Sequence, residues 1–461
     1  MSIIASFVMP HPPIIVPQIG RGEEKKIQRT IDACNEVAKR VLDIKPDTIV
    51  LTTPHAEMYF DYFHIAGGKS AKGNFEKFGA YYFNMTVDYD YEFVKELSDL
   101  AGENQFPAGT LGERDPQLDH GTTVPLYFIN QKYKDYKLVR IGLSDLSPEE
   151  HYQLGKMISN ISDKLDRKTV FLASGDLSHK FNTESPYGFV KEGPEFDLEV
   201  TKAMADGDFL TILNLDRGFC DAAAECGLRS FWIMAGALDK KSVKAELLSH
   251  EGPFGIGYGV ASFIVTGKDN TRNFDEQYLE LQKKHLNKVK QNENPYVKLA
   301  RNSIEHFVNT GNVAKLPSDL PAEMIKNKAG VFVSLKKHGL LRGCIGTISP
   351  VTKCIGEEIL RNAVSACSED PRFAPVEKDE LDKLVYSVDV LGKAEDIEDR
   401  SQLDIKRYGV IVTNGIKRGL LLPNLEGIDS VDQQIEIAMQ KAGIGKDEPY
   451  SLQRFEVVRH Y

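Results

Sequence analysis

The stretch that decides the fold is Phe171–His179, FLASGDLSH, an apolar run that ends in Gly-Asp and reaches a histidine three residues after the aspartate. Ile3–His11 (IIASFVMPH) and Thr48–His55 (TIVLTTPH) have the same form, since each is a β-rich apolar run with a histidine where the strand should end. Short continuous apolar runs of this kind predict buried strands. In open α/β sheets, ligands bind at the carboxyl ends of the strands. The three histidines therefore predict one crevice at the end of one sheet.

Strands and helices alternate along residues 1–267. The aromatic and glycine-rich stretch 58–88 predicts antiparallel strands or a covering loop. The alternation predicts an α/β N-terminal domain with a central mixed sheet. Helices are expected at 23–42, 91–101, 193–206 and 222–238 and from the Ser147-Pro148 cap onward, and further strands at 138–144 and 252–267.

The composition changes after this domain. Residues 268–295 are polar and almost free of large apolar residues, which is typical of a linker, here a partly helical one. Beyond it, 329–348 predict a hairpin around Lys336–Gly339. Residues 296–461 are therefore expected to form a smaller α+β C-terminal domain. Its other elements are expected to be helices at 296–309, 353–366 and 430–442 and strands at 385–392, 409–413 and 418–422.

The bulk composition excludes several classes of protein. A length of 461 residues suggests two or three domains, and 41% apolar with 27% charged residues is normal for a globular protein. The net charge of -10 is spread without a basic stripe, so neither nucleic acid nor a membrane is expected as a partner. The N-terminus lacks the features of a signal peptide, and the six scattered cysteines favour a reducing cytoplasm. The oligomeric state is left open.

The histidines gain weight from their joint placement. A single histidine at a strand end is more often a hydrogen-bonded structural residue than a ligand. Here His11, His55 and His179 each follow a predicted strand, and His120 stands in a Gly/Thr/Pro turn that would display it. Four such placements favour a metal or acid–base site. The other histidines of this domain lie in polar surroundings and are interpreted as surface residues: His64, His151 and His250.

A metal site would also need a carboxylate. Two imidazoles and one carboxylate leave three octahedral positions open, as in non-haem Fe(II) oxygenases. Candidates are Asp176, Glu225 and Glu251. Glu225 falls in the apolar helix expected at 222–238, where burial is costly unless a cation or Arg229 at i+4 is beside it. Asp176 has two alternative roles, capping the next segment or orienting His179.

Five motifs in this domain resemble those of the class III extradiol ring-cleavage dioxygenases, the LigB-like family: MPHPP, TTPH, LDHGTTVPLYF, SGDLSH and the Glu-containing helix before AGAL. The resemblance covers roughly residues 3–267. It implies that His11, His55 and Glu225 bind one Fe(II), with Zn or Cu as other possible metals. It also implies that His120 and His179 act as acid–base residues on a catechol-like aromatic substrate and O2, with Asp176 steering His179.

The C-terminal part resembles the AMMECR-type domain through LRGCIGT (341–347), SEDPRFAPV (368–376) and RGLLLP (418–423). Such domains occur as protein A of the AmmeMemoRadiSam system, beside a Memo-type relative of the dioxygenases and a radical-SAM protein. Within the first motif, Arg342 could meet an anion, Gly343 and Gly346 permit close backbone approach, and Cys344 could be a nucleophile. The competing and favoured interpretation makes Cys344 a small packed residue, with the glycines forming a bulge.

Three functions follow from these observations. The first is an Fe(II)-dependent extradiol dioxygenase. The second is a metal-binding protein with other redox or hydrolytic chemistry in a radical-SAM-linked modification pathway, because Cys226 falls where Memo-type relatives are expected to have a metal-site cysteine. The third is a non-catalytic adaptor with two binding domains.

Overall fold

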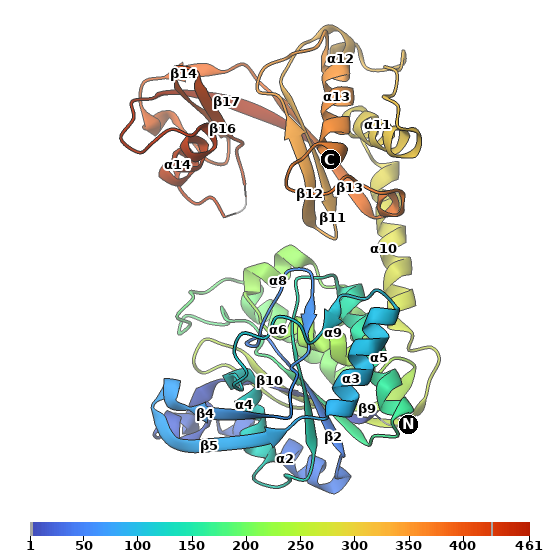
Figure 1. Cartoon of the computed structure of the whole chain (residues 1–461). Helices are drawn as coiled ribbons and strands as arrows, with labels where there is room; N and C mark the ends of the chain where they lie inside the picture. Colours follow the sequence, from blue (N-terminus) through green and yellow to red (C-terminus); the bar gives the residue numbers. More distant parts are fainter. Residues whose placement is uncertain (1–2, 426) are drawn as a thin grey trace. The chain divides into compact units, whose positions relative to one another are not determined.

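The computed structural model describes residues 3–425 and 427–461. The chain divides into two compact units, residues 1–280 and 281–461 (Figure 1). Among the described residues, every helix is too short or too polar to span a lipid bilayer. Each unit has its own sheet and its own apolar cores, so each is described separately.

The N-terminal unit is built on a six-stranded mixed sheet in the order β7-β2-β8-β1-β10-β9. The four strands β7, β2, β8 and β1 are parallel, and β10 and β9 are antiparallel. The apolar runs that predicted buried strands form β1, β2 and β8, which are almost wholly buried because helices cover both faces of the sheet. The strands are β1 Ile3–Met9, β2 Thr48–Thr53, β7 Lys137–Gly142, β8 Thr169–Ser174, β9 Lys241–Glu251 and β10 Tyr258–Lys268. The predicted fold class of this domain is confirmed.

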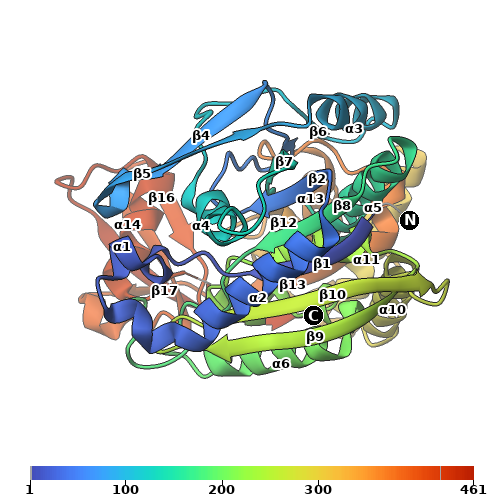
Figure 2. The same cartoon turned by 90° about the horizontal axis from the view of Figure 1, so that it is seen from below.

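Two cores lie on the two faces of this sheet. Ala5 and Phe7 of β1 join the core that includes residues of α2 and α4, while Val8 joins the core that includes residues of α5, α6 and α9. Figure 2 looks onto α2 and the strands β9 and β10. α5 begins as its sequence predicts, with Ser147 and Glu150 forming a reciprocal capping box. The helices are α1 Pro17–Gly20, α2 Gln28–Ile44, α3 Tyr91–Glu103, α4 His120–Ile129, α5 Pro148–Lys164, α6 Glu192–Asp206, α7 Phe209–Leu213, α8 Arg217–Ala223 and α9 Leu228–Ala237.

Two segments differ in detail from expectation. The stretch 58–88 contains the antiparallel pair β4 Ser70–Phe75 and β5 Ala80–Asp88, one of the two alternatives for it. The single helix expected at 222–238 is wrong, because α8 ends at Ala223 and α9 begins only at Leu228. Ala224 has a left-handed backbone (φ 54°), which ends α8 and opens a turn. The short elements are β3 Phe63–His64, paired with β6 Ala108–Gly109, and the 3₁₀ turns η1 Pro13–Ile15, η2 Glu23–Ile27 and η3 Glu76–Phe78.

The C-terminal unit has a seven-stranded antiparallel sheet with helices, so the predicted α+β class is confirmed. The order is β12-β11-β13-β17-β15-β16, and β14 also pairs with β17. The predicted hairpin joins β11 to β12 through His338 and Gly339, both with positive φ, as a tight hairpin turn requires. β17, which sequence reasoning missed, pairs with β13 through one half and with β14 and β15 through the other.

Its strands are β11 Val331–Lys337, β12 Leu340–Gly346, β13 Leu384–Leu391, β14 Glu395–Ile397, β15 Tyr408–Asn414, β16 Lys417–Leu421 and β17 Ser451–His460. Its helices are α11 Pro295–Thr310, α12 Ala322–Lys326, α13 Ile355–Ser368 and α14 Val431–Ala442, with 3₁₀ turns η4 Lys378–Lys383 and η5 Arg400–Gln402. The stretch expected to be a linker is mostly helix, α10 Phe274–Gln291, whose Phe274 and Tyr278 pack on the N-terminal unit.

Candidate metal centre

Three parallel neighbouring strands deliver the candidate residues to one end of the N-terminal sheet. His11 stands two residues after β1 and His55 two residues after β2, and the loop after β8 carries Asp176 and His179. β8 lies between β1 and β2 in the sheet, so the carboxyl ends of the three strands meet. His120 reaches the same place as the first residue of α4.

The structure brings His11, His55 and His120 together. One ligand nitrogen from each lies within 4.8 Å of the others. The Nε2 atoms of His11 and His55 are 3.0 Å apart, and the His55 and His120 ring centroids are 3.9 Å apart. His11 is buried, His120 is half-buried and His55 is exposed. Three imidazoles converging from three elements form a site that can hold a transition metal.

The hydrogen bonds of Ser174 assign the tautomer of His11. The Ser174 hydroxyl donates to the carbonyl oxygen of Gly121 (2.6 Å), so its oxygen can only accept from the Nδ1–H of His11 (2.9 Å). The Nε2 of His11 therefore carries the lone pair and can accept the Nε2–H of His55 across their 3.0 Å contact. A metal ligand histidine is commonly held by such a bond from its other nitrogen.

Asp176, in the loop after β8, and Cys226, in the turn before α9, both approach the Nε2 of His11. The Cys226 Sγ lies 3.8 Å and the Asp176 Oδ2 3.9 Å from the Nε2 of His11, so these three residues form a second possible ligand group. The other Asp176 oxygen accepts the backbone N–H of His11 (2.9 Å), and the Asp176 N–H donates to the Cys226 sulfur (3.3 Å). His11 is therefore shared by both groups.

Burial sets the charges of this cluster. Burial and, second to it, the neighbouring His55 lower the pKa of His11 to about 3. Burial and the two other imidazoles lower the pKa of His120 to about 3 as well. Burial raises the pKa of Asp176 to about 6 and raises that of the Cys226 thiol. The imidazoles are thus neutral at pH 7, which is the form that binds metals.

His179 lies beside this cluster with its Nε2 buried and without a hydrogen-bond partner among the described residues. Its backbone N–H donates to the carbonyl oxygen of Ala223, and its ring stacks on Tyr187 with centroids 5.5 Å apart. Burial lowers the pKa of His179, and the carboxylate of Asp176 opposes that shift. A buried polar atom without a partner is costly, so the Nε2 of His179 would be stabilised by a hydrogen bond to a bound molecule.

The donor set fits one divalent transition metal. It offers neutral imidazole nitrogens, one carboxylate and one thiol close together, with the unpartnered Nε2 of His179 beside them. Imidazole nitrogens with a carboxylate or sulfur donor suit Fe, Zn and Cu, whereas Mg and Ca prefer all-oxygen sites. The residues present are therefore compatible with the iron that the sequence motifs imply.

The two other candidate carboxylates lie outside both ligand groups. Glu225 stands in the turn before α9, where one of its oxygens accepts the backbone N–H of Leu228 (2.6 Å), and burial raises its pKa to about 7. Arg229, its expected helical partner, instead donates to Asp145 (2.6 Å). Glu251 accepts both the N–H and the hydroxyl of Thr30.

Of the three remaining histidines of this unit, His64 and His151 are not surface residues, so that expectation is wrong for these two, whereas the side chain of His250 is 24% exposed. His64 is 1% and His151 0% exposed. The Nδ1 of His151 bonds to the carbonyl oxygen of Ser147 one helical turn earlier, and burial lowers its pKa to about 3. His250 bonds to the fully buried Asp197 (2.7 Å). The spacing of His151 with the buried Leu154 and Ile158 places it on the apolar face of α5, a signal that the local polarity obscured.

The side chains of the Arg342-Gly343-Cys344 stretch of the C-terminal unit are engaged in contacts within that unit. The Arg342 guanidinium pairs with Glu380 (2.8 Å) and donates to the carbonyl oxygen of Ala374. The Cys344 sulfur accepts the hydroxyl of Ser334 (3.2 Å), and burial raises its thiol pKa. The register of the hairpin shifts by one residue beside Gly343, as the bulge interpretation predicts.

Gly343 and Gly346 must be glycines because neighbouring atoms lie too close to leave room for a Cβ. A Cβ on Gly343 would lie 2.3 Å from the carbonyl oxygen of Ala366 in α13, and one on Gly346 would lie 2.2 Å from the Phe332 ring. These contacts explain the motif by packing.

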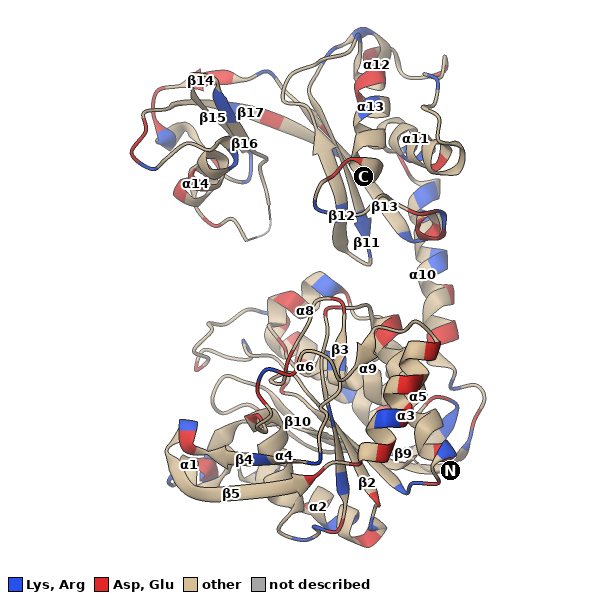
Figure 3. Ribbon diagram, in the orientation of Figure 1, with Lys and Arg blue, Asp and Glu red and all other residues tan. Residues whose placement is uncertain are grey.

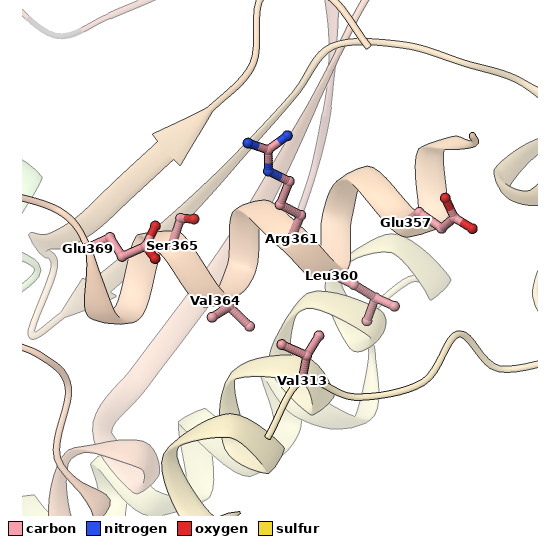
Figure 4. A pocket seen from close by; sticks show the side chains of 7 residues that line it. All are labelled: Val313, Glu357, Leu360, Arg361, Val364, Ser365 and Glu369. Atoms are coloured by element: carbon pink, nitrogen blue, oxygen red, sulfur yellow. The ribbon is translucent and has the colours of Figure 1, made fainter. Parts of the chain in front are cut away.

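Among the described residues, neither a cavity nor a charged patch indicates a second functional site as clearly as the histidine cluster does. An open pocket of about 460 Å³ in the C-terminal unit lies along α13, and of the predicted motif residues it includes only Glu369, from the SEDPRFAPV stretch (Figure 4). Basic and acidic residues are interspersed over the ribbon, in keeping with a chain that has no basic stripe (Figure 3). The pocket is lined by Val313, Glu357, Leu360, Arg361, Val364, Ser365 and Glu369.

Comparisons with known proteins match two families along the chain. Residues 5–261 match the family described as the catalytic LigB subunit of aromatic ring-opening dioxygenase, and residues 297–460 match the AMMECR1 family. A protein of Clostridium acetobutylicum is 42% identical and spans 100% of this chain and 99% of its own length. A protein of Thermotoga maritima is 48% identical over 36% of this chain and 98% of its own. The crystal structure of an uncharacterised protein from Pyrococcus horikoshii is 34% identical, with a TM-score of 0.34, over 36% of this chain and 88% of its own.

Proposed function

The chain belongs to the family of catalytic LigB subunits of aromatic ring-opening dioxygenases, joined to an AMMECR1 domain, and from this we propose an Fe(II)-dependent extradiol dioxygenase-like activity. The substrate class is a catechol-like or related chelating aromatic molecule, with O2 as the second substrate. The observation that carries the proposal is the convergence of His11, His55 and His120 on one point, with the tautomer of His11 fixed by Ser174.

In this proposal His11 and His55 hold the metal. When bound, Fe(II) would supply open coordination positions for the two oxygens of a chelating substrate and for O2. For the third ligand, the sequence motif implies Glu225, whereas Cys226 and Asp176 have donor atoms near His11. Glu225→Gln and Cys226→Ser variants, reconstituted with Fe(II) and measured for metal content, distinguish these assignments.

His120 and His179 are proposed to handle protons. A neutral imidazole with an unpartnered Nε2, as in His179, can accept a proton from a substrate hydroxyl and return it later. Asp176 is proposed to steer His179, since its buried carboxylate acts on that ring electrostatically. Tyr187, stacked on His179 and 60% exposed, offers an aromatic surface to a planar substrate.

Anaerobic reconstitution with Fe(II), followed by oxygen-uptake measurements on a panel of catechols, tests this function. We expect uptake with at least one catechol and a loss of 10²-fold or more in kcat, about the contribution of general acid–base catalysis, in His179→Ala. Metal content should stay near that of the wild type. An emptied metal site in His179→Ala would contradict its proton-transfer role, and tight iron binding with no uptake would refute ring cleavage.

A second candidate function is favoured by one observation, the Cys226 sulfur 3.8 Å from the Nε2 of His11. A thiolate ligand suits copper or zinc and would support redox or hydrolytic chemistry in a modification pathway shared with a radical-SAM protein. Tight Cu or Zn binding that is lost in Cys226→Ser, without oxygen uptake on catechols, is the result expected for this function.

A further inference from the structure

Asp119 lies at the junction of the two elements that carry His55 and His120. One carboxylate oxygen accepts the hydroxyl of Thr53, the last residue of β2 (2.6 Å), and the backbone N–H of Thr122 (3.0 Å). The other accepts the Thr122 hydroxyl (2.9 Å). Asp119 is therefore the N-cap of α4 and at the same time the partner of a neighbouring strand.

A directed chain of hydrogen bonds leads from this carboxylate to His55. Because the Thr53 hydroxyl gives its proton to Asp119, its oxygen is free to accept the backbone N–H of His55 (3.2 Å). Linked bonds of this kind polarise one another. On the other side of Asp119, His120 is the first residue of the helix that it caps.

The contact between the two elements leaves no room for adjustment. A Cβ on Gly121 would lie 2.4 Å from the Thr53 hydroxyl oxygen and 3.3 Å from Cδ2 of His55. The first turn of α4 thus rests directly on the end of β2. Any shift of Asp119 would change the separation of the two imidazoles.

The Asp119 carboxylate also pairs with the buried guanidinium of Arg140. This arginine of β7 is 1% exposed, pairs with the Asp119 carboxylate at 3.8 Å and donates to the carbonyl oxygen of Gln117 (2.6 Å). Its other nitrogen lies 3.4 Å from Glu113. A buried guanidinium needs such partners, so Arg140 ties the segment before α4 to the sheet.

We infer that Asp119, held by Arg140, is a positioning residue that sets the place of His55, a proposed metal ligand, relative to His120, a proposed proton-transfer residue. The inference rests on the proposed metal centre and adds a residue that neither ligates nor touches the substrate. Asp119 acts through Thr53 on one side and through the first turn of α4 on the other.

The chain offers a matched control at the opposite end of the same strand. Asp90 caps α3, accepts the hydroxyl of Thr48, the first residue of β2 (2.6 Å), and pairs with Arg167 (3.2 Å). Asp90 is 1% exposed, as is Arg140, the arginine that pairs with Asp119. Asp90, however, lies at the amino end of β2. Asp90→Asn removes the same kind of charge, cap and strand contact without facing the histidines.

The experiment compares Co(II) binding to the full-length wild type, Asp119→Asn and Asp90→Asn by titration and visible absorption. We expect Asp119→Asn to weaken Co(II) binding 10–100-fold and to alter the ligand-field bands, as loss of a ligand-supporting contact does. Asp90→Asn should stay within twofold of wild type while losing comparable thermal stability. Equal Co(II) affinities for the wild type and Asp119→Asn would overturn the inference, as would equal losses in both variants.

A metal-free measurement separates this inference from the proposed function. The rate of carbethoxylation of His55 and His120, followed by peptide mass spectrometry, should rise several-fold in Asp119→Asn and stay unchanged in Asp90→Asn. If the wild type binds no Co(II), the metal centre is refuted, and the modification rates still decide whether Asp119 holds the two rings. Unchanged rates in Asp119→Asn would refute the positioning role.

Discussion

Ser174 decides which nitrogen of His11 faces the other imidazoles. Its hydroxyl is committed to Gly121, so it accepts from the Nδ1–H of His11 and leaves Nε2 with its lone pair. We predict that Ser174→Ala weakens metal binding by about 10–100-fold, the cost usual for losing a group that orients a ligand. Isothermal titration with Co(II) measures this.

Ser6 provides the control for that change. It is a fully buried serine of β1 whose hydroxyl has no partner among the described residues. Ser6→Ala should therefore leave the metal affinity unchanged. Equal affinities for Ser174→Ala and wild type would show that the tautomer of His11 is fixed in another way.

Glu380 gives the C-terminal unit a pH-dependent stability. Its burial is outweighed by Arg342 and Lys337, which lower its pKa from 4.5 to about 2. A carboxyl whose pKa is lower in the folded state stabilises the fold fully above its unfolded pKa, and this is lost as the pH falls from about 4.5 towards 2. We predict that Glu380→Gln costs about 1–2 kcal/mol at pH 7. Urea unfolding at several pH values should show the difference from wild type shrinking below pH 4.5.

The positions of His11 and His55 could be predicted from the sequence, whereas the position of Glu225 could not. Histidines at the ends of apolar runs were enough to predict that His11 and His55 meet, because parallel neighbouring strands end at one edge. The position of the Glu225 carboxylate was beyond that reasoning, since it depends on the left-handed Ala224 that ends α8. A left-handed residue cannot be recognised from the sequence unless it is a glycine, the residue that adopts this conformation readily.

At the scale of elements, α13 and β12 pack with backbone nearly against backbone at Gly343. We predict that Gly343→Ala destabilises the C-terminal unit by about 1–3 kcal/mol, the range for overpacking, because its Cβ would meet the Ala366 carbonyl oxygen at 2.3 Å. Gly445→Ala, whose Cβ would meet Glu448 at 3.4 Å, is the control. Thermal unfolding of both variants checks this, and equal melting temperatures would contradict the packing explanation of the motif.

Elements with strong patterns were predicted and those with weak patterns were not. β1, β2 and β8 are continuous apolar runs, and α5 has a complete capping box, so these elements can be predicted from their sequences. β17, SLQRFEVVRH, is missed because charged and polar residues interrupt it and only Phe455 is fully buried. Its strand conformation depends on partners distant in sequence, which local propensity does not reveal.

At the scale of the whole molecule, two compact units with separate cores are joined through one chain. The candidate metal ligands all belong to the first unit. We predict that calorimetry resolves two transitions and that Co(II) raises one of them. The stabilisation should be about 2.7 kcal/mol when free metal is at 100 times its Kd.

The His11→Ala variant provides the check on that prediction, because it lacks the ligand common to both candidate groups. Its two transitions should not respond to Co(II). An equal upward shift of both transitions in the wild type would show that metal also binds the C-terminal unit or that the two units unfold together.

The pairing of β17 has a consequence for biosynthesis. Residues 451–460 close the sheet between β13 and β15, although both of these strands are translated earlier. Until β17 has been translated, β13 and β15 have edges without their final neighbour, which is the state in which strands join other chains. The N-terminal sheet needs nothing beyond β10 and can assemble during this interval. The C-terminal unit is therefore the part of the nascent chain that would most need a chaperone.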